Sequence, residues 1–303
     1  MMKLHTNILK QSISNRIMRP VLFDVSLRDG IQGANPNFYD TQTKKGLFDQ
    51  IRNKYIPAKM EIGSFVSPKV LPIMSDTPEM FDYAIKTARQ EDTFSPDIYA
   101  LVPNKKGLLD AIRHGVRNFS FITSVSNEFQ VKNTRRDLDF KKTELQEMMA
   151  LVASINGVCK TKLYVSCINE CPISGLIDSD YVIYEILSEY GLAEFEDGFT
   201  LDEICLSDTM GTLKTRDFEY IVDGLLRFGL PTSRISLHLH VGKDNELDAK
   251  RILFACFRRG IHQFDVSYVG EGGCSVSMDR ANLKPNMTYE FFRSTLDDYN
   301  RDL

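Results

Sequence analysis

Short apolar runs alternate with longer amphipathic stretches along most of the chain. Runs of this length, bounded by polar and turn-forming residues, predict strands. The stretches between them have the spacing of amphipathic helices. The expected strands are residues 20–27, 59–65, 97–103, 118–124, 162–167, 203–208, 234–241 and 263–268, and the expected helices are residues 41–54, 77–90, 104–114, 139–156, 179–191, 214–228, 244–259 and 287–300.

Several of the expected helices begin with residues that commonly cap a helix amino terminus. A side-chain oxygen at that position accepts a hydrogen bond from an otherwise unpaired backbone N–H, and proline is tolerated in the first turn. The expected capping residues are Thr77 (before Pro78), Asn104, Asp139, Ser179 and Asp244.

Strands separated by helices indicate parallel βαβ units. Eight such units in about 280 residues predict an α/β fold of the (β/α)8 TIM-barrel type. A doubly wound sheet is the competing fold, but it usually has fewer strands and a G-x-G-x-x-G loop after the first one. The first strand here leads into "DVSLRDGIQG", which lacks that pattern. We expect residues 1–19 to form a lead-in without fixed structure, and residues 20–303 to form one catalytic barrel domain.

Composition and charge narrow the function classes. The formal net charge is −4, so nothing global favours binding to nucleic acid or to a membrane surface. No run approaches the roughly 20 apolar residues that span a bilayer. Six scattered cysteines without a C-x-x-C pair indicate a reducing compartment, and we expect a cytoplasmic protein. The basic first twenty residues are also compatible with import into the mitochondrial matrix, although we favour a plain basic lead-in.

Chemically versatile side chains collect near the carboxyl ends of the expected strands, where TIM barrels carry their active sites. Asp208 and Ser124 end their strands, Glu61 lies within the second, and glycines follow the eighth. The remaining members of this set are Arg28, Asp29, Cys167, His238, His240 and Cys274.

The segment "SLHLHVG" predicts a metal site. Side chains at i and i+2 of a strand point to the same face, so His238 and His240 enter one space. Asp29 is a suitable third ligand, because the first strand of a closed barrel adjoins the second and the last. Mixed nitrogen and oxygen ligands favour Mg²⁺ or Mn²⁺, with Zn²⁺ as an alternative. The competing interpretation is a pair of histidines that only bond their neighbours.

Arg28 beside such a metal could stabilise an enolate oxygen, or it could form only a local ion pair with Asp29. Glu61, a charged residue inside a strand, must be paired or catalytic, and we expect it to pair with Arg28. The loop "GEGGCS" carries Cys274, which is either a mobile acid or nucleophile or an inert thiol on a flexible loop.

Seven segments in order resemble the 3-hydroxy-3-methylglutaryl-CoA lyase family, from about Val21 to Leu283. They are "DVSLRDGIQ", "EIGSFVSPKVLPIMSDT", "SVSNEFQVKN", "YVSCINECP", "LSDTMG", "HLH" and "GEGGC". The resemblance implies a TIM-barrel, metal-dependent carbon–carbon lyase. It further implies metal ligands Asp29, His238, His240 and Asn282, and catalytic or supporting residues Arg28, Cys274, Glu61 and Asp208. We expect substrate contacts from Gln32, Ser64, Ser124, Gly272 and Gly273.

The implied reaction is a retro-Claisen cleavage of a 3-hydroxyacyl-CoA, such as 3-hydroxy-3-methylglutaryl-CoA, to a keto acid and acetyl-CoA. We expect an acyl-CoA or hydroxy-acid substrate and a homo-oligomer, a dimer. The chain departs from the family pattern at 33–35 and 241–244, and the spacing from Cys274 to Asn282 is about one residue short. Two alternatives therefore stay open: aldol or Claisen chemistry on another hydroxy or 2-keto acid, and an inactive metal-binding scaffold.

Overall fold

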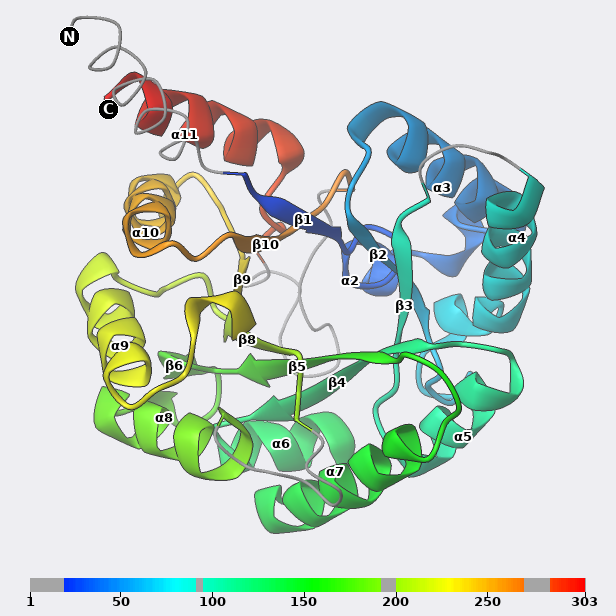
Figure 1. Cartoon of the computed structure of the whole chain (residues 1–303), viewed down its shortest axis with the longest axis horizontal. Coiled ribbons are helices and arrows are strands. Elements are labelled where there is room, and N and C mark those ends of the chain that lie inside the picture. The colour runs from blue at the N-terminus through cyan, green and yellow to red at the C-terminus, as the bar shows by residue number, and fades with distance from the viewer. Residues whose placement is uncertain (1–18, 91–94, 192–199, 270–283, 303) are drawn as a thin grey trace, which may run out of the picture.

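The computed structural model describes residues 19–90, 95–191, 200–269 and 284–302. At its centre, eight parallel strands close into a barrel, and helices form a ring around it (Figure 1). The barrel strands are β1 (Val21–Asp24), β2 (Lys59–Ser64), β3 (Asp97–Leu101), β4 (Asn118–Ser124), β5 (Lys160–Ser166), β8 (Glu203–Asp208), β9 (Ile235–Leu239) and β10 (Gln263–Val266). Their order around the barrel is β1-β10-β9-β8-β5-β4-β3-β2. The predicted (β/α)8 TIM barrel is therefore confirmed.

The outer helices follow the predicted alternation closely. They are α3 (Thr41–Tyr55), α4 (Thr77–Gln90), α5 (Lys105–Arg113), α7 (Leu138–Ala153), α8 (Ser179–Ile186) continued by a π-helical turn (Leu187–Gly191), α9 (Thr215–Arg227), α10 (Glu246–Arg259) and α11 (Tyr289–Arg301). In the described part of the chain, no helix combines the length and the apolar character needed to cross a membrane.

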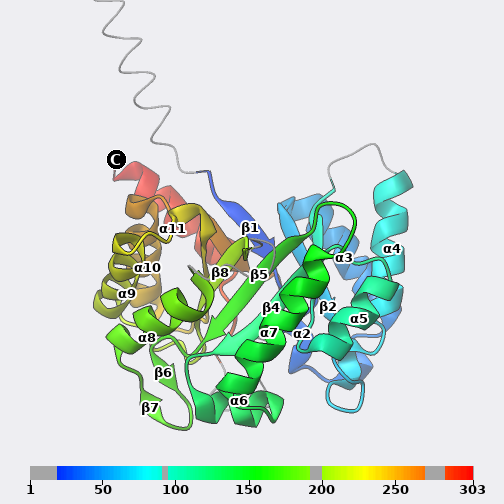
Figure 2. The same ribbon diagram turned by 60° about the horizontal axis from the view of Figure 1, so that its bottom comes forward.

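Smaller elements lie in the loops that follow β1, β2, β4 and β5 and in the connection from α9 to β9. They are the helices α2 (Asp29–Gln32) and α6 (Asn127–Thr134), the hairpin of β6 (Glu170–Cys171) and β7 (Gly175–Leu176), and 3-10 turns at Pro36–Phe38, Pro72–Met74 and Thr232–Arg234. The hairpin and α6 project at the same end of the barrel (Figure 2). None of these elements was predicted, because segments of two to eight residues are too short to establish a period.

Of the expected capping residues, Asn104 is confirmed. Its side chain accepts a hydrogen bond from the Gly107 N–H at 2.9 Å, at the start of α5. The other four expected capping residues lie one or two positions from the observed caps, because acidic and hydroxyl residues also occur around the first helical turn. The predicted helix starts at residues 77 and 179 are confirmed. Helix α4 begins at Thr77 itself, and Asp137, Asp178 and Asn245 hold the cap positions expected for Asp139, Ser179 and Asp244.

Closure of the barrel brings the two ends of the sequence together. Strand β1 pairs with β10 on one side, where Phe23 lies opposite Asp265, and with β2 on the other, where Phe23 lies opposite Lys59. Strand β9 follows next to β10. The loop after β1 is therefore only two strands away from the end of β9, although more than 200 residues separate them in sequence.

The barrel interior is partly apolar and partly charged. Phe23, Tyr99 and Tyr164 belong to an inner apolar cluster that is separate from the larger core between strands and helices. Against the rings of this cluster, Lys162 and Asp265 form a buried ion pair. Charged groups are expensive to bury unless they are paired, so this arrangement needs an explanation beyond packing.

The side chain of Asp24 projects from the outer face of β1, opposite to Phe23, and is fully buried. Its carboxylate accepts hydrogen bonds from the Tyr289 hydroxyl at 2.9 Å and from the Ser26 hydroxyl at 2.8 Å. Burial nevertheless dominates and raises the pKa of Asp24 to about 7, against the opposing effect of these hydrogen bonds. The folded state thus holds this proton more tightly than the unfolded chain does.

We predict that Asp24 makes folding less stable as the pH rises from about 4 through 7, since ionisation is penalised only in the folded state. Asp24→Asn has no proton to lose. The free energy of unfolding of the variant, relative to the natural chain, should therefore increase by about 2 kcal/mol between pH 5 and pH 8. Urea unfolding at both pH values measures this, and parallel pH profiles for the two proteins would show the assignment to be wrong.

Candidate metal centre and active site

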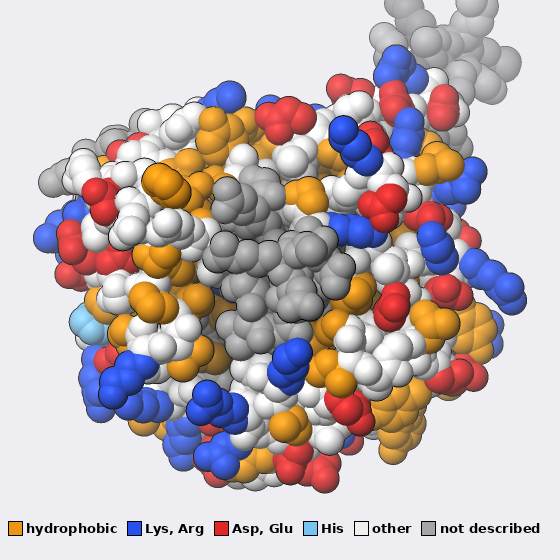
Figure 3. Space-filling model, turned by 180° about the vertical axis from the view of Figure 1, so that it is seen from behind, with side chains coloured by type: hydrophobic (Ala, Val, Ile, Leu, Met, Phe, Trp, Pro, Cys, Tyr) orange, Lys and Arg blue, Asp and Glu red, His pale blue; other side chains and the backbone are white. Residues whose placement is uncertain are grey.

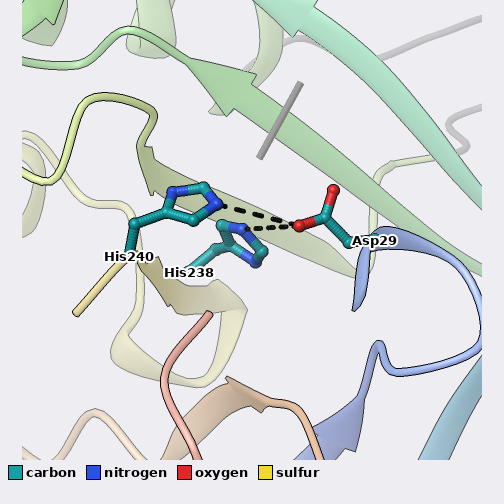
Figure 4. A group of neighbouring side chains, drawn as sticks. All are labelled: Asp29, His238 and His240. Atoms are coloured by element: carbon teal, nitrogen blue, oxygen red, sulfur yellow. Dashed lines mark ion pairs between the residues drawn. The ribbon is translucent and has the colours of Figure 1, made fainter. Parts of the chain in front are cut away.

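Three buried side chains converge at the carboxyl end of the barrel. Asp29 is the first residue of α2, in the loop that follows β1, while His238 lies in β9 and His240 follows that strand. Both imidazole rings point toward the same carboxylate oxygen (Figure 4). The Nε2 atom of each histidine lies 3.7 Å from Asp29 Oδ2. The expected meeting of residues from opposite ends of the chain is thus found.

The opposite nitrogen of each ring has its own oxygen partner. His238 Nδ1 lies 3.1 Å from a carboxylate oxygen of Asp265, and His240 Nδ1 lies 3.0 Å from the backbone carbonyl oxygen of Asp208. With Nδ1 facing an acceptor, Nε2 is the nitrogen that each ring turns toward Asp29. This is the usual arrangement of histidines that bind metals.

The geometry and the hydrogen bonding both fit a divalent cation. Asp29 Oδ2 and His240 Nε2 are buried and have no hydrogen-bond partner within the described residues. Ligand atoms bound to one ion at about 2.0–2.2 Å are separated by roughly 3–4 Å, and the separations of 3.7 Å lie in that range. One carboxylate and two imidazoles leave coordination positions for substrate oxygens or water.

The environment of this centre favours the metal-binding protonation state at Asp29 and His238, whereas at His240 a metal would have to displace a more tightly held proton. Burial alone would raise the pKa of Asp29, but Arg28, His240 and His238 outweigh it and hold that pKa well below its usual range. Burial lowers the pKa of His238, and Asp265 opposes this only in part. At His240, burial is outweighed by Asp29 and Asp208, which raise the pKa.

Arg28 links the metal centre to Glu61. Its Nε donates to Glu61 Oε2 and its Nη1 donates to Asp29 Oδ1, so the expected pairing with Glu61 and the local ion pair with Asp29 both occur. The guanidinium carbon also lies 4.9 Å from the centre of the Tyr164 ring. These contacts fix a buried cation beside the three candidate ligands.

A cavity of about 930 Å³ lies over this centre, and its lining includes Arg28, Asp29, His238 and His240. Two of the expected substrate-contacting residues also line it, namely Gln32 and Ser64. Gln32 donates to Asp29 Oδ1 at 2.7 Å, and the backbone of Ser64 is held by the Thr77 hydroxyl.

Other expected site residues lie behind the cavity surface. Ser124 is fully buried and does not line the cavity; its hydroxyl donates to the Ser166 carbonyl and accepts from the Ser126 N–H. It therefore shapes the loop after β4 instead of facing the cavity. The Asp208 carboxylate accepts from the N–H groups of residues 212 and 213. Cys167, expected at the end of a strand, follows β5 in a left-handed conformation and is fully buried.

Four of the expected residues belong to the segment 270–283, which lies outside the described residues. They are Gly272, Gly273, Cys274 and Asn282. Their roles stay predictions from the sequence.

Sequence reasoning missed Asn286. It forms an antiparallel bridge with His240, and the side chains of two residues paired in this way project from the same face. Asn286 is 1% exposed, and neither atom of its amide has a hydrogen-bond partner in the described part of the chain. Buried amides are nearly always bonded, so this one is a candidate ligand. No hydrophobic pattern in the sequence marks Asn286 as a site residue. The only signal was the spacing from Cys274 to Asn282, which is about one residue shorter than in the family.

A basic rim on the cavity was also missed. We define it as Lys106 of α5, Lys132 of α6, and the two residues that follow this helix, Arg135 and Arg136. All four side chains are exposed and all line the cavity. Figure 3 shows the opposite face of the molecule from Figure 1, where basic side chains gather at the lower left. Such a rim attracts anionic groups toward the cavity.

Comparison with known proteins identifies the family. The family model described as HMGL-like matches residues 19–282. Hydroxymethylglutaryl-CoA lyase YngG of Bacillus subtilis is 30% identical over 258 residues, which cover 83% of this chain and 77% of that protein. The mitochondrial hydroxymethylglutaryl-CoA lyase of Arabidopsis thaliana is 26% identical, and the match spans about half (53%) of that longer protein.

Solved structures agree on the fold. The crystal structure of hydroxymethylglutaryl-CoA lyase from Pseudomonas aeruginosa superposes with a TM-score of 0.77 at 24% identity, covering 94% of this chain and 87% of that one. The lyase from Bacillus subtilis gives a TM-score of 0.74 at 25% identity, covering 93% and 87%. The match to the family model extends over most of the sequence and includes all the motifs that indicated this family. The chain therefore belongs to the HMGL-like family.

Proposed function

We propose that this protein is a metal-dependent carbon–carbon lyase that cleaves a 3-hydroxyacyl-CoA, with 3-hydroxy-3-methylglutaryl-CoA as the first candidate. The observation that carries the proposal is the convergence of Asp29, His238 and His240 beside the buried Arg28 in one cavity. The names of the relatives, hydroxymethylglutaryl-CoA lyases, support the reaction class. The homodimer and the cytoplasmic location expected from the sequence stay predictions.

The charge of the centre suits this chemistry. Asp29 and Glu61 carry two negative charges against one positive charge on Arg28, so the buried cluster is left with one net negative charge to receive a cation. A divalent cation reverses that sign. The loaded centre would then attract the carboxylate and hydroxyl oxygens of a hydroxy acid.

The reaction follows from these groups. When bound, the divalent cation polarises the substrate oxygens that it contacts. Loss of the tertiary hydroxyl proton to a base converts the carbinol carbon to a ketone, while the electrons of the broken C–C bond pass to the thioester as an enolate. Arg28 is available to stabilise the enolate oxygen. A proton then returns to the enolate carbon. By family resemblance, Cys274 or a water held by it supplies that proton.

The basic rim supports a CoA ester over a free hydroxy acid. A CoA thioester carries several phosphate charges at a distance from its acyl group, and exposed arginine and lysine side chains at the cavity edge are suitable partners for phosphates. The cavity, at about 930 Å³, can accept a long ligand as well as the reacting acyl group.

Replacing Arg28 tests the reaction directly. Arg28→Lys keeps the charge but loses the planar fork that contacts Asp29 and Glu61. We expect kcat for release of acetyl-CoA from 3-hydroxy-3-methylglutaryl-CoA to fall by about 10²–10³-fold. Arg234→Lys is the matched control, since Arg234 donates only to backbone carbonyls away from the cavity. Equal activity of both variants, or no turnover by the natural chain with Mg²⁺ or Mn²⁺, contradicts the proposal.

Asn286 is proposed as a further ligand through its amide oxygen. Asn286→Leu should weaken Mn²⁺ binding by at least about 10-fold in calorimetric titration. In the metal-free protein it should leave stability unchanged or raise it, because an unbonded amide is removed. Asn245→Leu is the control: that amide is fully bonded next to His240, so its loss should destabilise the metal-free fold by about 2–3 kcal/mol. If Asn282→Leu weakens binding and Asn286→Leu does not, Asn282 is the ligand.

The rim can be tested with two substrates that share one acyl group. The double change Arg135→Ser and Arg136→Ser should raise KM for the CoA ester about 10-fold or more and leave kcat nearly unchanged, because the rim is remote from the reacting carbons. The corresponding pantetheine ester lacks the nucleotide phosphates and should show little change. A similar rise in KM for both esters would mean that the rim does not select phosphate.

A further inference from the structure

Asp265 is a buried carboxylate that the proposed reaction does not use. It lies on β10 inside the barrel and is 2% exposed. Its Oδ1 accepts from Lys162 Nζ, and its Oδ2 lies 3.1 Å from His238 Nδ1. One carboxylate thus contacts both a buried lysine and a candidate metal ligand.

Lys162 is held from several sides. Its Nζ lies 2.8 Å from Glu203 Oε1, 4.0 Å from the centre of the Phe23 ring and 4.8 Å from the centre of the Tyr164 ring. Glu203 is paired in turn with Lys59 Nζ at 2.6 Å. Lys59, Glu203, Lys162 and Asp265 therefore form a column of alternating charges that leads through the barrel to His238. We call this the charged column.

The stability of the fold does not by itself account for the charged column. Paired charges in a barrel interior are often no better than apolar side chains of the same volume. What the column provides is position: Lys162 occupies one oxygen of Asp265, which leaves the other oxygen to face His238. An anchored acceptor at this place determines which ring nitrogen carries the proton and how the ring is turned.

We propose that Asp265, anchored by Lys162, is a positioning residue that keeps the His238 proton on Nδ1 and so presents Nε2 to the metal centre. The inference rests on the proposed function only in its consequence for metal affinity. The tautomer of His238 can be observed without any metal. At His240 the same part is taken by a backbone carbonyl, the oxygen of Asp208, so no side chain holds its tautomer.

Replacing Asp265 by asparagine should reverse the tautomer. With one oxygen instead of two, the amide would accept from Lys162 through Oδ1 and donate through its NH₂ group to His238 Nδ1. The proton of His238 then belongs on Nε2, where it blocks metal binding. Glu203→Gln is the matched control. It also removes one negative charge from the charged column and one carboxylate partner from Lys162, but Glu203 does not contact His238.

The experiment is ¹⁵N NMR of the histidine rings in the metal-free protein, followed by Mn²⁺ titration. We expect Asp265→Asn to shift His238 to the Nε2–H tautomer and to weaken Mn²⁺ binding about 10–100-fold, with Glu203→Gln keeping the natural tautomer and an affinity within a few-fold. An unchanged tautomer in Asp265→Asn overturns the inference, as does an equal loss of affinity in both variants.

Two further outcomes are separable. If the natural chain binds no Mn²⁺, the proposed metal centre fails, while the tautomer measurement still tests Asp265. If Asp265→Asn does not fold, the double change Lys162→Met and Asp265→Leu removes the buried pair together. His238 Nδ1 then has no acceptor, so a mixture of tautomers and the same weakening of Mn²⁺ binding are expected; a single Nδ1–H tautomer would contradict the inference.

Discussion

Closure of the barrel is the constraint on which the proposed site depends. A parallel barrel is complete only when its first strand pairs with its last, and here β1 pairs with both β10 and β2. That pairing brings Asp29 to within 3.7 Å of His238 in β9 and of His240, which follows that strand. No local segment could assemble this group of ligands, since its members come from the two ends of the sequence.

Compensation of buried charge explains the surroundings of the site. Arg28 is shared between Asp29 and Glu61, while Lys162 is shared between Asp265 and Glu203. The Tyr164 ring lies between the two groups, within 5 Å of both cations. The charged column, which includes Lys59, has no net charge, whereas the group of Arg28, Asp29 and Glu61 keeps one net negative charge. A divalent cation would compensate that negative charge. Of the two groups, only the one that contains Arg28 and Asp29 lines the cavity.

Much of this architecture could be predicted from the sequence. All eight barrel strands were expected within a few residues of their bounds, because each is a compact apolar run set between amphipathic helices. The pairing of Glu61 with Arg28 followed from the need to neutralise a charge inside a strand. The same argument applies to Lys162 and Asp265, which occur in "KLYVSC" and "QFDVSY", and it would have located the charged column. Asn286 and the basic rim could not be found this way. Asn286 is placed by a tertiary bridge to His240, and three of the four rim residues lie on or directly after the unpredicted helix α6.

The central claim is that one cation is bound jointly by Asp29, His238 and His240. X-ray diffraction from crystals soaked in Mn²⁺, recorded at the manganese absorption edge, tests it most directly. The account predicts a single strong anomalous peak within about 2.0–2.4 Å of Asp29 Oδ2 and of both Nε2 atoms. A peak bound elsewhere, or no peak with the three side chains ordered as described, would contradict it.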